Sequence, residues 1–67
     1  MNTYFLIADS SSNTGKEYIS EDHSNTGDET SAKLFKTEDE TKDWIKSQGF
    51  GDWAYVTTME TEEEFDL

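Results

Sequence analysis

The feature that most constrains the fold is a short helix whose start and end are both marked in the sequence. Thr37 is followed three residues later by Glu40. This is the spacing of a capping box, in which the Thr hydroxyl accepts from the Glu40 amide and the Glu40 carboxylate accepts from the Thr37 amide. Carboxylates fill the first turn, where the helix dipole favours them. Gly49 supplies the left-handed residue that often follows a helix. The sequence therefore predicts a helix over residues 38–48.

This helix needs a second layer to be stable. Trp44 and Ile45 are its large apolar residues, so its buried stripe is narrow. An isolated helix of about eleven residues is marginal in water. Phe50, just past the helix, is placed to fold back onto Ile45. The helix must therefore lie on another element, and the sequence offers a sheet.

Three segments have the composition of strands. Residues 3–9 form a compact run of mainly apolar and aromatic side chains, which predicts a central strand buried on both faces. Residues 16–20 alternate weakly and predict a second strand that pairs with the first as a hairpin, across a turn at 10–15. Residues 53–59 predict a third strand whose odd-numbered side chains share one face. Residues 21–30 predict a polar, mobile loop.

The expected architecture is an α+β domain in the order β-β-α-β, with a three-stranded antiparallel sheet and one helix on one face. The domain is expected to span residues 1–59, and residues 60–67 form an acidic tail that is either frayed or used as a binding arm. Residues 31–35 remain open between a short strand and an entry into the helix. The second sheet face is expected to be uncovered, so that aromatic side chains on it could bind a partner. The expected core comprises Phe5, Ile7, Tyr18 or Ile19, Leu34, Phe35, Trp44, Ile45, Phe50 and Val56.

The charge of the chain is strongly acidic. There are 16 acidic residues against five lysines, no arginine, and a formal net charge of −11. Such a balance with few aliphatic residues favours disorder, but nine aromatic residues and mutually consistent strand and helix signals favour a folded domain. The absence of cysteine excludes disulfides and thiolate metal sites. With no apolar run near the length of a membrane span and no basic N-terminal region, we expect a soluble, cytoplasmic protein.

No catalytic set is evident in the sequence. His23 is the only histidine and lies in a loop among carboxylates, which favours a solvated residue over a general base. The chain contains many carboxylates, but none is set apart by a distinct environment as an acid and base pair would be. We therefore expect a protein that is not an enzyme and that uses no cofactor.

A calcium loop is also disfavoured. Asp9, Ser11 and Asn13 alternate as calcium ligands do, but Gly15 comes one position late and Ser20 stands where a bidentate Glu is needed. A second alternating run fails in the same way, from Asp22 through Ser24 and Thr26 to Asp28. We therefore expect no metal site.

The sign of the charge disfavours direct binding to nucleic acid but suits a nucleic-acid mimic. Lysine and arginine supply the affinity for phosphate backbones, whereas residues 47–67 carry six carboxylates and no cation. An array of carboxylates can instead enter a basic groove that holds nucleic acid, with electrostatic steering and aromatic anchors. Alternatively, these charges merely confer solubility. The candidate partner-binding residues are Glu38, Asp39, Asp43, Asp52, Glu60, Glu62, Glu63 and Glu64, with Trp53 and Tyr55 as anchors.

In size, charge, lack of cysteine and compact layout, the chain resembles the small acidic proteins with which bacteriophages disable host enzymes. That class includes anti-CRISPR proteins, uracil-DNA glycosylase inhibitors and anti-restriction DNA mimics. The resemblance implies a non-enzymatic inhibitor in the bacterial host cell that blocks or locks a basic nucleic-acid-binding protein, such as a CRISPR effector. The alternative is a small accessory interaction protein or antitoxin that binds through its uncovered sheet face or an edge strand.

Overall fold

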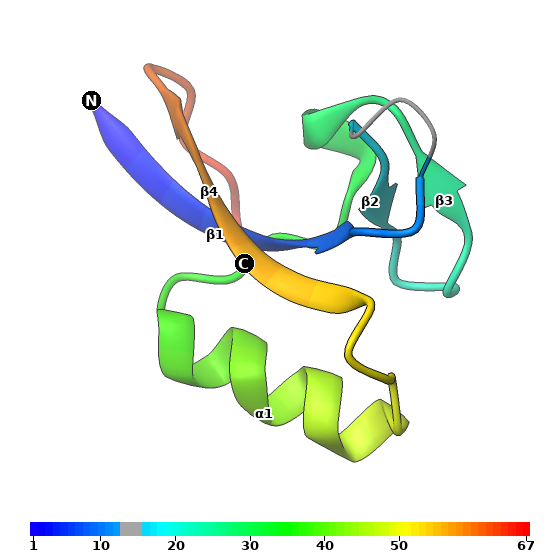
Figure 1. Cartoon of the computed structure of the whole chain (residues 1–67). Coiled ribbons are helices and arrows are strands. Elements are labelled where there is room, and N and C mark those ends of the chain that lie inside the picture. Colours follow the sequence, from blue (N-terminus) through cyan, green and yellow to red (C-terminus); the bar gives the residue numbers. More distant parts are fainter. Residues whose placement is uncertain (13–15) are drawn as a thin grey trace.

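The computed structural model describes residues 1–12 and 16–67 of the chain. Within these residues the protein is a four-stranded antiparallel sheet in the order β3-β2-β1-β4, with one α-helix along one face (Figure 1). The α+β class is therefore confirmed. The elements are β1 (Asn2–Asp9), β2 (Tyr18–Ile19), β3 (Asn25–Thr26), a short 3-10 helix η1 (Glu29–Ser31), α1 (Glu38–Gln48) and β4 (Ala54–Thr61).

The centre of the sheet is β1, as the sequence predicts. It pairs with β4 over eight positions, from Asn2 opposite Thr61 to Asp9 opposite Ala54. Its other edge pairs with β2 at Ala8 and, through an isolated bridge, with Phe35. The run of apolar residues in β1 is buried because it has neighbours on both edges and packing on both faces.

The helix has the predicted bounds, the predicted Gly49 at its end and one of the two predicted capping-box hydrogen bonds at its start. The Thr37 hydroxyl accepts from the Glu40 amide at 3.2 Å, and the buried Thr41 hydroxyl donates to the Thr37 carbonyl at 2.8 Å. Gly49 has φ +73°, and the Phe50 amide donates to the Ile45 carbonyl at 3.2 Å. Both ends of the helix are thus hydrogen-bonded by residues that the sequence singles out.

The prediction of three strands is wrong, because residues 21–30 contain a fourth. Tyr18 pairs with Thr26, and Ile19 pairs with Asn25, so β3 forms the outer edge of the sheet. The Asn25 side-chain amide donates to Asp9 Oδ2 at 2.9 Å, which ties this edge to β1. Backbone pairing with β2 and the polar Asn25 side chain, rather than an apolar pattern, therefore hold β3 in place.

The core consists of two clusters, one on each sheet face. On the helix face, Ile7, Ile19 and Phe35 are buried beneath Trp44 and Ile45. On the other face, the cluster is Tyr4, Leu6, Ala32, Leu34 and Met59, with Tyr18 and Phe65 packed against it. The sequence predicted much of the first cluster but, of the second, only Leu34 and the alternative Tyr18.

The expectation of an uncovered second face is therefore wrong over the part near Tyr4. Residues 32–34 cover it from one side, and the C-terminal segment covers it from the other. The Phe65 ring packs edge-on to the Tyr4 ring at 5.3 Å, and the Phe65 amide donates to the Tyr4 hydroxyl at 2.8 Å. A single aromatic residue in the acidic segment thus brings residues 62–67 back to the sheet.

Strand β4 begins one residue later and ends two residues later than predicted, so Glu60 belongs to the sheet. Because β4 is the last strand in the order, its outer side is an edge of the sheet. In the described residues, no helix is both long and apolar enough to cross a membrane.

Candidate functional site

The predicted binding residues on α1 all face solvent. Glu38, Asp39 and Asp43 are exposed, since the buried side of the helix is taken by Thr41 and the half-buried Trp44. The Glu38 carboxylate pairs with Lys42, one turn later, at 3.0 Å. Its hydrogen bond and charge raise the pKa of Lys42. The outer side of the helix therefore remains acidic, with one of its carboxylates already paired.

A second group of predicted residues lies at the end of β4. Glu60, Glu62, Glu63 and Glu64 are all exposed. The segment is positioned rather than frayed, because the Asn2 side-chain amide donates to the Glu63 carbonyl at 2.9 Å and Phe65 packs on the sheet. Four carboxylates are thereby presented from a fixed stretch of backbone.

The two predicted anchors do not form one patch. Trp53 precedes β4 and packs on Phe50, with ring centroids 5.2 Å apart, at the end of α1. Tyr55 lies opposite Ala8, on the sheet face away from the helix, and is 46% exposed. Asp52, also exposed, sits in the turn between α1 and β4. The anchors are exposed as predicted but point to different sides of the molecule.

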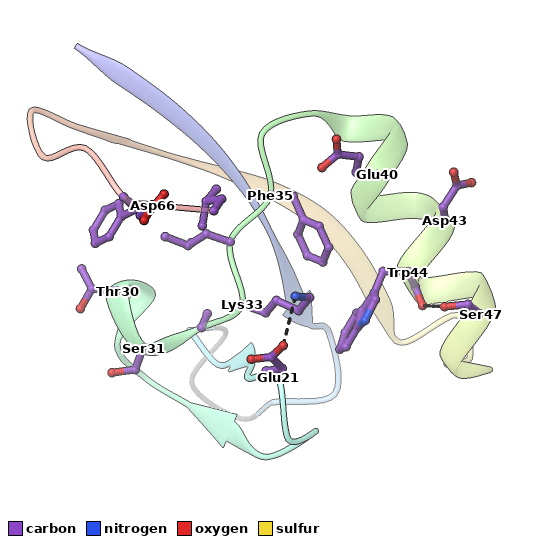
Figure 2. A pocket seen from close by; sticks show the side chains of 14 residues that line it. Glu21, Thr30, Ser31, Lys33, Phe35, Glu40, Asp43, Trp44, Ser47 and Asp66 are labelled. Atoms are coloured by element: carbon purple, nitrogen blue, oxygen red, sulfur yellow. Dashed lines mark hydrogen bonds and ion pairs between the residues drawn. The ribbon is translucent and has the colours of Figure 1, made fainter.

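Sequence reasoning missed a groove between α1, residues 30–35 and the C-terminal segment (Figure 2). Its volume is about 920 Å³ and it opens to solvent. Phe35 and Trp44 line it, with ring centroids 5.8 Å apart. The Lys33 ammonium lies 5.2 Å from the Phe35 centroid, 5.7 Å from the Trp44 centroid and 3.6 Å from Glu21 Oε1. The available signal was the i, i+2 spacing of Lys33 and Phe35, which places both side chains on one side of an extended segment.

His23 is exposed as expected, but it is not a free loop residue. Its ring packs edge-on to Trp44 at 5.6 Å and to Phe50 at 5.1 Å, and its Nε2 hydrogen-bonds to Gln48 Oε1 at 2.9 Å. Its backbone is left-handed, with φ +72°. His23 therefore joins the loop between β2 and β3 to the end of α1.

The alternating polar residues that resemble calcium loops have a structural explanation. The Asp9 carboxylate accepts from the Ser11 amide and hydroxyl, and the same two-residue turn occurs at Asp22 and at Asp28. These hydrogen bonds lower the pKa of each of the three aspartates, with the side-chain hydroxyl bond the largest cause. Asn13 and Gly15 lie outside the described residues.

Within residues 1–12 and 16–67, no three or more His, Asp or Glu side chains are grouped to hold a metal ion. No family model, curated protein or solved structure matches this chain. Its own surface chemistry is therefore the basis for proposing a function.

Proposed function

We propose that this protein is a non-enzymatic inhibitor that binds a basic groove of a nucleic-acid-processing host protein and excludes its substrate by mimicking nucleic acid. The observation that carries the proposal is the display of carboxylates on a small folded scaffold: the outer side of α1 and residues 60–64 present them in exposed positions. Within this class, an anti-CRISPR protein that binds a CRISPR effector in a phage-infected bacterium is the form we propose first.

The charge density supports mimicry. The molecule extends 30 × 25 × 17 Å. A duplex 30 Å long carries about eighteen phosphate charges, since each 1.7 Å of its axis bears about one. This chain carries 16 carboxylates, partly offset by five lysines. The net charge of −11 is about three-fifths of that of the duplex, so a groove evolved to hold a duplex would meet a negative field of the same order on a body of similar length.

The test is a pull-down from bacterial lysate with the tagged protein, eluted by a salt gradient and by competing duplex DNA. We expect one nucleic-acid-binding protein that both treatments release, because both compete with charge pairing. A captured partner that neither salt nor DNA releases would contradict mimicry.

Two sets of neutralising substitutions divide the interface. One set changes the four glutamates at 60, 62, 63 and 64 to Gln, and the other changes Glu38 to Gln with Asp39 to Asn. Each should weaken binding and reduce its salt dependence. If a set of substitutions changes neither the affinity nor its salt dependence, the residues of that set do not belong to the interface.

A second candidate is an accessory interaction protein or antitoxin that binds through the β4 edge. The supporting observation is an eight-residue edge strand that carries the exposed Tyr55, the arrangement that strand addition uses. Binding that is insensitive to salt but lost in Tyr55→Ala would favour this candidate. Trp53→Ala is the comparison variant, since Trp53 packs at the end of α1 instead.

A further inference from the structure

We propose that the groove in Figure 2 binds an arginine or lysine side chain from a basic segment of the partner protein, over the rings of Phe35 and Trp44 and against Glu40 and Asp43. This inference rests on the proposed function, because it specifies how a cationic partner is recognised beyond long-range charge.

The aromatic pair has the chemistry of a cation site. The two rings are tilted by 54° and line the groove, where Phe35 is only 7% exposed and the half-buried Trp44 presents the more accessible ring. A cation within about 6 Å of an aromatic centroid is attracted by the negative face of the ring, most strongly for Trp. Both rings come from well-anchored positions, since Phe35 is bridged to Phe5 of β1 and Trp44 lies in α1.

Lys33 shows that this pair accepts an ammonium group. Its Nζ lies within 5.7 Å of both centroids, and its side chain is only 25% exposed. The same ammonium group also forms an ion pair with the Glu21 carboxylate. An intramolecular lysine therefore occupies part of the groove in the way that we propose for a partner's side chain.

The charges of the lining leave room for a second cation. The groove is lined by four carboxylates and one lysine. In the part of the chain that the structure describes, neither Glu40 nor Asp43 is paired with a cation. Both belong to α1, and in Figure 2 the Glu40 carboxylate extends from the helix toward the Phe35 side, whereas the Asp43 carboxylate points away from the two rings. A cationic side chain is therefore complementary in charge to the lining of the groove.

Other occupants fit less well. A second copy of the chain would bring another net charge of −11 to an already acidic groove, and a nucleic acid would bring phosphates, so like charges would repel both. Arginine should bind better than lysine, because its planar guanidinium stacks on an aromatic face while its N–H groups pair with a carboxylate.

The test is titration of the ¹⁵N-labelled protein with an acetylated, amidated oligo-arginine peptide, followed by NMR. We expect the largest shifts at the Trp44 indole N–H and at the amides of residues 33–35 and 40–44. Shifts confined to residues 60–64 or to residues 38 and 39 would overturn the inference.

Two matched pairs of variants separate the groove from general charge attraction. Glu40→Gln with Asp43→Asn should weaken peptide binding by about tenfold, and Glu62→Gln with Glu63→Gln, which removes the same charge elsewhere, by about twofold. Lys33→Met should tighten binding by about threefold because it removes a competing cation, and Lys36→Met, an exposed lysine outside the groove, should have a smaller effect. Equal effects within either pair would overturn the groove site.

These outcomes are independent of the pull-down. If the peptide misses the groove while a captured nucleic-acid-binding protein is still released by salt, the groove inference fails and the proposed function stands. If the groove binds arginine but no such protein is captured, the proposed function fails instead.

Discussion

Strands β1 and β4 are joined over eight residue pairs, whereas β2 and β3 are joined over two. The long pair lies between the two apolar clusters and carries the helix. The short pair, with η1 beside it, is anchored by Ile19 and is surrounded by aspartates that accept from Ser, Thr and Asn groups. One half of this small sheet is therefore built by apolar burial, whereas the other combines the buried Ile19 with many polar hydrogen bonds. The two halves should respond differently to mutation and to acid.

The largest effect is expected from Leu6→Ala in the long pair. Leu6 is fully buried, and removing such a side chain costs about 2–5 kcal/mol, a large part of the roughly 3–10 kcal/mol expected for a domain of this size. Urea unfolding followed by circular dichroism measures the change. Thr26→Ala in the short pair should cost less than about 1 kcal/mol. If both variants lost the same free energy of unfolding, the two halves would contribute equally to the cooperative core. The proposed difference between the two halves would then be wrong.

The next largest effect is expected at the N-terminal caps of the two helices, which are Thr37 for α1 and Asp28 for η1. Thr37→Ala removes the hydroxyl that accepts from the Glu40 amide and should lower the free energy of unfolding by about 1 kcal/mol. Thr37→Ser keeps the acceptor and is the control. Asp28→Ala removes the cap of η1, and there we expect faster amide exchange at residues 29–31 with little change in global stability. Exchange that quickens across β1 in Asp28→Ala would contradict this separation.

The difference between the two halves of the sheet also explains why the sequence predicted the β1–β4 half better than the β2–β3 half. The long half obeys periodic rules: a capping box at Thr37, a left-handed Gly49 and strands with apolar or alternating side chains. The short half does not, because Asn25 and Thr26 are a polar two-residue strand that pairs with β2 and is tied by the Asn25 side chain to Asp9, sixteen residues earlier. No local pattern encodes that contact.

The same limit applies to the candidate site. Exposure of the acidic residues on α1 was predictable, because Thr41, Trp44 and Ile45 define its inner side. The groove was not, since it joins Lys33, Trp44 and Phe65 from three separate segments. The sequence contained one indication that the C-terminal segment packs on the sheet, because Phe65 is an isolated aromatic residue within an acidic run. Its burial against Tyr4 changed a predicted tail into a positioned segment.

Acid should loosen the short half selectively. The pKa values of Asp9, Asp22 and Asp28 are lowered by hydrogen bonds made only in the folded chain. Their contribution is therefore complete above about pH 4, the ordinary range of an aspartate, and is lost as the pH falls through the lower folded values. Titration by NMR should show the amides of Ser11 and Thr30 moving upfield below that pH while the β1–β4 amides stay in place. Simultaneous loss of both sets would contradict a selective effect.

The smallest effect is expected at the Lys42–Glu38 pair, which joins two exposed side chains one helical turn apart. The raised pKa of Lys42 means that its contribution is present at neutral pH and is lost only as the pH rises through the folded value, above its ordinary value. Solvent screens such a pair, so Lys42→Met should leave the melting temperature within about 1 °C of the parent. Thermal melts at low and high salt measure this. A clear, salt-dependent loss of stability would show that charge pairing, as well as apolar burial, holds the long half together.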